Sequence, residues 1–259
     1  MQPLPPRPLI ARPLLRPLAW LLLQTLLLGL GLMSLAWNAV ALLLLPLLGR
    51  ERGRRIGRAV ISRGYAFFWR AARATGLLQM DARALDPLAQ EPGLIVVANH
   101  PSMLDAVMLM ARLPRSACVM KASLARNPFV GAAARLARYI RNDSTYGLVR
   151  LAVADLRLGG QLVLFPEGTR TTRWPVNPFH SVVGLIAQRA QAPVQAVFID
   201  TDSPYLGKGW PLWRLPPLPI VFTVRLGRRF PPADDPQALQ AELQAYFAEG
   251  VQRTPPLAR

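Results

Sequence analysis

A histidine and an aspartate separated by four residues, His100 and Asp105, form the pair in this chain best suited to acid–base chemistry. They follow the apolar run 94–98, which predicts a buried strand, and the polar turn after it predicts the start of a helix. Asp105 would then lie about one helical turn beyond His100 and could hold one imidazole nitrogen. The other nitrogen would be a base with an ordinary pKa of about 6.5, which cycles near neutrality. On its own, the spacing fits equally well a histidine that only caps a turn.

A second polar turn follows another apolar run. Residues 161–165 predict a strand, and the segment 166–170, Pro-Glu-Gly-Thr-Arg, comes at its end. A glycine such as Gly168 lets the backbone approach a ligand closely, and the guanidinium of Arg170 is a planar fork that matches a phosphate. A solvent-exposed Pro-Gly turn would explain the same residues. Two such turns after two strands, one with a base and one with an anion-binding fork, favour an active site instead.

Together the two turns resemble the signatures of the glycerophospholipid acyltransferases, and specifically of the 1-acylglycerol-3-phosphate acyltransferase family. The segments 99–105 and 165–170 are both intact, in the family's order and about sixty residues apart. Weaker blocks also match, because Lys121 stands where the family tends to carry a substrate-contacting lysine, and Arg141 lies in a segment that resembles its middle block. The resemblance covers about residues 79–250.

Three positions depart from the family pattern. Asn142 stands where an acidic or other polar residue is common, His180 replaces a lysine, and Gln195 lies in a loosely matching strand. These departures do not touch the two main signatures, but they leave the identity of the acyl acceptor open.

The resemblance implies direct acyl transfer. His100, oriented by Asp105, would remove a proton from an acceptor hydroxyl, which would attack the thioester of acyl-CoA or of acyl-carrier protein. The implied acceptor is a lysophospholipid, foremost 1-acyl-sn-glycerol-3-phosphate, which would give phosphatidic acid. Glu167 is expected to orient Arg170 or a hydroxyl. The residues expected to bind the acceptor and its phosphate are Lys121, Arg141, Glu167, Gly168, Thr169 and Arg170.

Neither a metal nor another cofactor is expected, and the acyl thioester is a co-substrate. Two histidines eighty residues apart and one cysteine do not make a ligand cluster. A covalent acyl-enzyme is also not expected, because Cys118 lies in a strand-like run and Ser102 has no Gly-x-Ser-x-Gly elbow around it.

Two alternatives stay open beside this reaction. The acceptor is either lysophosphatidic acid or another lyso-lipid from a specialised pathway, and the chain is either an enzyme or a non-catalytic, membrane-associated scaffold of the same fold. The presence of His100, Asp105, Glu167 and Arg170 together favours the enzyme, because a scaffold does not need all four.

The composition predicts a membrane partner. The chain has 259 residues, enough for one α/β domain and a membrane segment, and 52% of them are hydrophobic. Its net charge of +17 indicates an anionic partner. Zinc patterns, RNA-binding motifs and basic helices with heptads are absent from the sequence, so membrane lipids rather than nucleic acid are expected.

Residues 18–49 carry no charged side chain and consist largely of leucine, which predicts a membrane-embedded segment. The run exceeds the roughly 7 to 15 apolar residues of a signal peptide. Gly29, Gly31 and Asn38 interrupt it, so a single spanning helix and a re-entrant helical hairpin both fit. The arginines are more numerous after the run than before it, which places the catalytic domain on the cytoplasmic side, at the inner membrane in a bacterium.

The elements that must position the two turns alternate along the chain. Strands are predicted near 94–98, 117–121, 162–165, 194–199 and 220–226, with helices over 103–112, 147–157 and 235–249. This alternation predicts an α/β fold with a mixed, largely parallel sheet flanked by helices. The segment 204–219 predicts a long loop whose tryptophans either touch the membrane interface or fold onto the core. The predicted segments are a Pro/Arg-rich tail (1–17), the membrane segment (18–49), a basic interfacial or linking helix (50–78) and the catalytic domain (79–259).

Overall fold

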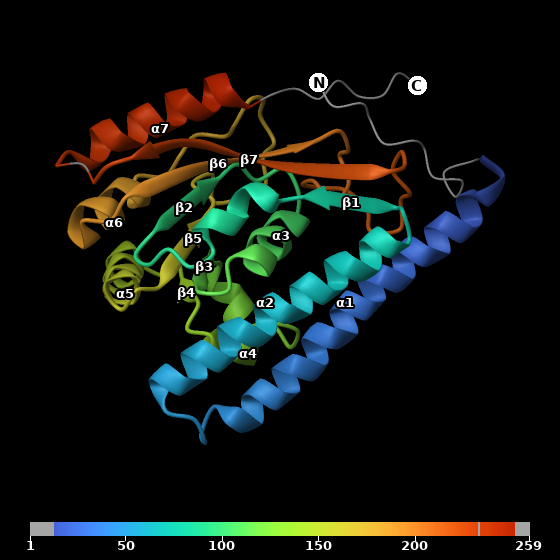
Figure 1. The fold of residues 1–259 in the computed structure, drawn as a ribbon, viewed down its shortest axis with the longest axis horizontal. Coiled ribbons are helices and arrows are strands. Elements are labelled where there is room, and N and C mark those ends of the chain that lie inside the picture. The colour runs from blue at the N-terminus through green and yellow to red at the C-terminus, as the bar shows by residue number, and fades with distance from the viewer. Residues whose placement is uncertain (1–12, 233, 252–259) are drawn as a thin grey trace.

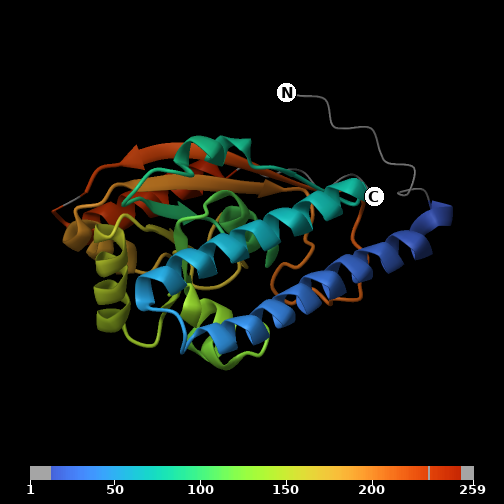
Figure 2. The same ribbon diagram turned by 60° about the horizontal axis from the view of Figure 1, so that its bottom comes forward.

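The computed structural model describes residues 13–232 and 234–251 of the chain (Figure 1). A seven-stranded sheet forms its centre, with helices on both faces and a long helical hairpin along one side (Figures 1 and 2). The strands are β1 (Leu78–Asp81), β2 (Ile95–Ala98), β3 (Ser116–Met120), β4 (Ile140–Arg141), β5 (Gln161–Leu164), β6 (Val194–Thr201) and β7 (Ile220–Phe230). The helices are α1 (Arg16–Leu44), α2 (Arg50–Ala74), α3 (Leu104–Arg112), α4 (Gly131–Leu136), α5 (Thr145–Arg157), α6 (Val182–Ala190) and α7 (Pro236–Gly250), with short 3-10 helices η2 (Pro13–Leu15), η3 (Arg83–Leu88) and η4 (Ala122–Arg126).

The strand order is β1-β7-β6-β2-β5-β3-β4, and every neighbouring pair is parallel except β6 and β7. This confirms the predicted fold class. The predicted strands are present to within a few residues, although β7 continues to Phe230. The short strands β1 and β4 and the helices α4 and α6 were not predicted, because their apolar runs are too short to show a period.

Both faces of the central strands are buried, as expected for parallel strands covered by helices. In β2, Ile95 and Val97 pack into the core under α5, α6 and α7. Val96 and Ala98 point to the opposite face and pack under α2 and α3. This double burial fixes the register of β2, because a shift by one residue would exchange the two faces.

Helix α1 is continuous, and the interruptions expected at Gly29 and Gly31 do not occur. A glycine inside a helix costs only about 1 kcal/mol, and the leucines around these positions are strong helix formers. The turn lies instead between Leu44 and Arg50, so the helical hairpin is made by α1 and α2 (Figure 2). Within the described residues, α1 is long and apolar enough to cross a membrane. Residues 1–12 of the predicted tail lie outside the described residues, and the limits of the catalytic domain stay a prediction.

The polar side chains of α1 bind the rest of the protein. Near its start, Trp20 donates through Nε1 to the carbonyl of Trp213 at 2.7 Å, and Gln24 donates to that of Leu212 at 3.0 Å. Near its end, the Oδ1 of Asn38 accepts from the backbone amides of Ala132 and Ala133 at 2.7 and 3.1 Å. These amides lie in the first turn of α4, which has no intrahelical acceptors for them. The contact with residues 212–213 shows that the loop 204–219 folds back onto α1.

Helix α2 is packed on the domain, which is one of the two arrangements expected for the basic helix. Phe68 and Trp69 are buried, and the side chain of Arg58 is buried as well. Arg58 makes two hydrogen bonds to the carboxylate of Asp155, at 2.7 and 3.0 Å, and two more to backbone carbonyls. Arg54 donates to the same carboxylate at 3.2 Å. These contacts join α2 to α5 across the domain.

Substitution of Asp155 tests this junction. Asp155→Asn would leave the buried guanidinium of Arg58 without a counter-charge, and breaking a buried pair in this way costs about 3–5 kcal/mol. We expect a large decrease in the free energy of unfolding, measured by thermal or denaturant unfolding in detergent. The matched control is Asp86→Asn, which breaks the exposed pair with Arg112 and should cost less than about 1 kcal/mol. Equal effects of the two variants would contradict the structural role of the buried pair.

Candidate active site

The predicted site residues lie at one edge of the sheet. β2, β5, β3 and β4 are parallel neighbours, so their carboxyl ends point the same way. His100 follows β2, the turn 166–170 follows β5, Lys121 follows β3, and Arg141 ends β4. Ligands of open α/β sheets bind at this edge.

The expected pair is formed. The Nδ1 of His100 lies 2.9 Å from Oδ2 of Asp105, and the same oxygen accepts from the amide of Ser102 at 2.8 Å. Asp105 is fully buried, and its Oδ1 has no hydrogen-bond partner in the described part of the chain. Burial raises the pKa of Asp105, and the contact with His100 lowers it by less. The contact with Asp105 favours the tautomer in which Nδ1 carries the proton and Nε2 is the free base.

The ring of His100 is held on its other side by an aromatic contact. It stacks on Phe165, with ring centroids 4.1 Å apart and planes inclined by 19°. Its side chain remains 18% exposed, and Nε2 makes no hydrogen bond within the described ranges. His100 can therefore receive a proton at Nε2 without moving the ring.

Glu167 joins the two turns. Its buried carboxylate accepts three hydrogen bonds, from the amide of His100 at 3.0 Å, the hydroxyl of Thr171 at 2.7 Å and the amide of Asn177 at 2.9 Å. Glu167 was expected to orient either Arg170 or a hydroxyl. In the structure it accepts a hydrogen bond from the hydroxyl of Thr171. The other expectation, a contact with Arg170, is not met among the described residues. A buried carboxylate saturated by these donors positions the base rather than an acceptor phosphate.

Arg170 holds the loop that covers the first turn. Its Nη1 donates to the carbonyls of Leu206 and Gly207 at 2.8 and 3.0 Å. The carbonyl of Leu206 also accepts from the amide of Met103, and Ser102 donates its hydroxyl to the carbonyl of Tyr205. The Nε and Nη2 of Arg170 make no hydrogen bond in the described part of the chain, so they are available to an anion.

Gly168 is a position that requires glycine. Its φ is +65°, and an added Cβ would lie 2.7 Å from Nε2 of His180. The imidazole of His180 thus packs on the turn, where the resemblance places a lysine. Thr169 lies beside it, half-buried.

Lys121 and Arg141 lie farther along the same edge of the sheet than His100. They lie next to each other at the sheet edge, because Met120, which precedes Lys121, pairs with Arg141. Two strand spacings separate β2 from β3, and three separate it from β4, which corresponds to about 10 and 14 Å. Arg141 is exposed and ion-paired with Asp143 at 2.8 Å, while Lys121 is exposed and makes no side-chain contact with the described residues.

Several positioning residues were not singled out from the sequence. Ser102, Phe165, Thr171 and Asn177 contact His100, Asp105 or Glu167 as described above. Asn177 also accepts at Oδ1 from the amides of residues 172 and 173. None of these residue types has a spacing that predicts such contacts, and those of Thr171 and Asn177 with Glu167 form only when the loop 171–181 folds back.

Comparison with known proteins gives three similarities. A family profile named Acyltransferase matches residues 79–200, which include both turns. The chain is 29% identical to a lyso-ornithine lipid O-acyltransferase of Pseudomonas aeruginosa over 151 residues, 54% of this chain and 58% of that protein, so it spans less than two thirds of that relative. The fold is similar to the crystal structure of the 1-acyl-sn-glycerophosphate (LPA) acyltransferase of Thermotoga maritima, with a TM-score of 0.62 and 20% identity over 90% of this chain and 93% of the other.

Asp105→Asn is expected to raise the stability of the folded protein at neutral pH while lowering the reaction rate. The raised pKa of Asp105 means that the folded state binds more protons than the unfolded state, so wild-type stability falls as pH rises through the interval between the two pKa values. The variant does not titrate there. We expect it to unfold at a higher temperature than wild type at neutral pH, with the difference disappearing in acid, while the rate falls by at least about 10²-fold. A variant less stable than wild type at neutral pH would contradict this account of the buried carboxylate.

Proposed function

We propose that this chain, which belongs to the glycerophospholipid acyltransferase family, transfers an acyl group from a thioester to the free hydroxyl of a lyso-lipid. The observation that carries this proposal is the pairing of His100 with Asp105 at 2.9 Å, which leaves Nε2 of the partly exposed His100 side chain without a hydrogen bond among the described residues. Bases of this kind contribute about 10²–10⁴-fold in rate.

The reaction follows from these positions. Nε2 of His100 takes the proton of the acceptor hydroxyl as its oxygen attacks the thioester carbonyl, and Asp105 stabilises the imidazolium that forms. Collapse of the tetrahedral intermediate breaks the carbon–sulfur bond, and the imidazolium returns the proton to the leaving thiolate. The donor is acyl-CoA or acyl-carrier protein. After transfer, CoA or the carrier protein leaves with a free thiol.

Two acceptor classes are candidates. The first is 1-acyl-sn-glycerol-3-phosphate, whose phosphate would bind the free Nε and Nη2 of Arg170, with Lys121 and Arg141 contacting it from the sheet edge. The second is a lyso-lipid with an amino-acid headgroup. The similarity to the lyso-ornithine lipid acyltransferase supports it.

We further propose that α1 lies along the membrane surface on the cytoplasmic side instead of crossing the bilayer. Its contacts through Trp20 and Asn38 are eighteen residues apart, about 27 Å along a helix, which nearly equals the roughly 30 Å of a hydrocarbon core. A spanning α1 would therefore draw the catalytic domain into the lipid. The face turned away from the buried Ala19, Leu23 and Ala41 carries an exposed leucine stripe at steps of four, three and seven residues: Leu14, Leu18, Leu21, Leu28, Leu32, Leu35 and Leu42.

Transfer of labelled acyl groups tests the reaction. Wild type and His100→Ala would be incubated in detergent with lysophosphatidic acid or lyso-ornithine lipid, each with CoA and carrier-protein thioesters. We expect product from wild type with at least one acceptor, and a loss of 10²-fold or more in His100→Ala at an unchanged unfolding temperature. Absence of product from folded wild type with every pair would favour the scaffold alternative.

Substitution of the leucine stripe tests the membrane orientation. Leu28→Ser combined with Leu32→Ser should reduce sedimentation with anionic vesicles several-fold, because two exposed apolar side chains leave the acyl region. Leu158→Ser is the matched control, since Leu158 is 64% exposed and Leu28 is 63% exposed, but Leu158 follows α5 on another part of the surface. Equal losses in both variants, or none in either, would contradict the proposed orientation.

A further inference from the structure

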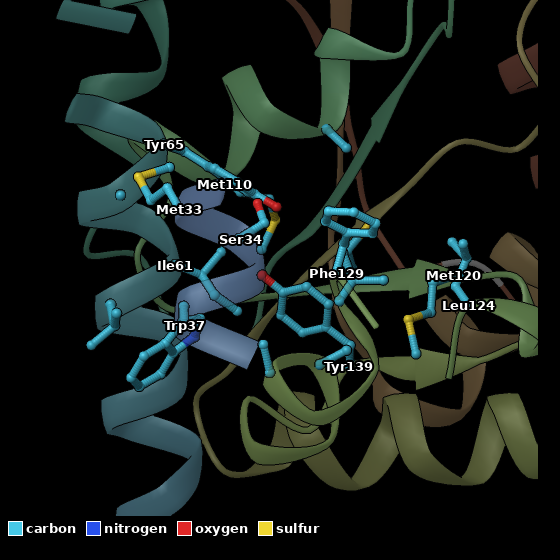
Figure 3. Close-up of a pocket in the computed structure, with 17 residues that line it drawn as sticks. Met33, Ser34, Trp37, Ile61, Tyr65, Met110, Met120, Leu124, Phe129 and Tyr139 are labelled. Atoms are coloured by element: carbon cyan, nitrogen blue, oxygen red, sulfur yellow. The ribbon is translucent and has the colours of Figure 1, made fainter. Parts of the chain in front are cut away.

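An apolar pocket lies between the helical hairpin and the catalytic domain. It has a volume of about 200 Å³, and side chains of α1 and α2 form one wall, while α3, β3 and the region of α4 form the other (Figure 3). Met33, Ile61, Met110 and Phe129 are among its apolar lining residues. Such a lining suits a hydrocarbon chain.

The pocket also contains polar atoms that nothing in the protein satisfies. The hydroxyl of Tyr139 and the indole Nε1 of Trp37 are both buried and have no hydrogen-bond partner within the described residues. Burial raises the pKa of Tyr139 well above its ordinary value. Ser34 and Tyr65 line the same space (Figure 3). Buried polar groups are almost always paired in folded proteins, so two orphans in one pocket indicate a missing partner.

The pocket reaches the elements that carry the active site. Ala106, which lines it, directly follows Asp105 on α3, and Met120, which also lines it, directly precedes Lys121 at the end of β3. A chain in the pocket would thus lie under the turn that holds His100.

We propose that this pocket binds a hydroxylated acyl chain, with Tyr139 and Trp37 recognising the hydroxyl group. The inference rests on the proposed function and narrows its substrate class. An indole N–H only donates, whereas a phenol both donates and accepts. In the proposed complex, the oxygen of a hydroxyl on the chain accepts from Trp37 or exchanges a hydrogen bond with Tyr139, which supplies a partner that the described residues do not. An unsubstituted chain would leave both atoms unpaired in an apolar environment.

Binding of free fatty acids to the His100→Ala protein tests the proposal without turnover. Fatty acids with the hydroxyl at successive positions would each be compared with the unsubstituted acid of the same length, by displacement of a fluorescent fatty acid. We expect at least one hydroxyl position to bind about tenfold more tightly than the unsubstituted chain, which corresponds to one net hydrogen bond. Tyr139→Phe in the same background should abolish this preference.

The matched control is Tyr205→Phe. Tyr205 is also buried with an unpaired hydroxyl, but it does not line the pocket, so its substitution should leave the preference intact. Tyr139→Phe should unfold at the wild-type temperature or above it without ligand, because it removes an unpaired polar atom. Equal binding of both classes of chain, absence of binding, or a preference that survives Tyr139→Phe would overturn the proposal.

Failure of the hydroxyl-recognition proposal can be distinguished from failure of the proposed acyl-transfer function. A hydroxyl preference in a protein that transfers no acyl group would retain this pocket assignment and reject the reaction. Acyl transfer by wild type, combined with equal binding of both chains, would retain the reaction and reject the hydroxyl recognition.

Discussion

The buried carboxylate of Glu167 is the contact on which the active site depends. The turn after β2 and the turn after β5 belong to neighbouring strands. The carboxylate of Glu167 bonds the amide of His100 to the loop 171–177, beside the direct hydrogen bond from the Thr171 amide to the His100 carbonyl at 2.7 Å. Burial of a charge is unfavourable unless hydrogen bonds compensate it, and the three donors here are the compensation. The base is therefore positioned from both sides, through its backbone by Glu167 and through its ring by Asp105 and Phe165.

The helical hairpin is part of the same structure and not a detached anchor. The buried pair of Arg58 and Asp155 fixes α2 on α5, and Asn38 fixes α1 on α4. The pocket next to the site exists only because α1 and α2 supply one of its walls. The exposed leucine stripe and the pocket-lining residues Met33 and Trp37 thus lie on different faces of α1, which under the two proposals gives a lipid a short path from the bilayer to the pocket.

The sequence predicted the parts of the molecule that depend on local patterns. Apolar runs that end in polar turns located β2 and β5, and the two turns located His100, Asp105 and Arg170. It did not predict the order of the strands, which depends on contacts between distant segments. Lys121 and Arg141 follow β3 and β4, which lie on the side of β5 away from β2, and their contact with an acceptor phosphate stays a prediction. The partners of Glu167 in the following loop, Thr171 and Asn177, could not be predicted either, because a threonine and an asparagine in a loop show no periodic pattern. The sequence left open whether residues 18–49 form one helix or a re-entrant pair. Helix α1 is continuous because a glycine inside a leucine-rich helix costs only about 1 kcal/mol.

The central claim is that Asp105 holds His100 with Nε2 as the free base. The chain has only two histidines, so ¹⁵N spectra of the imidazoles contain two sets of signals, and a His180 variant assigns them. The account predicts that at neutral pH His100 carries its proton on Nδ1, with a downfield-shifted proton resonance that disappears in Asp105→Asn. A His100 protonated on Nε2, or a spectrum that Asp105→Asn leaves unchanged, would contradict it.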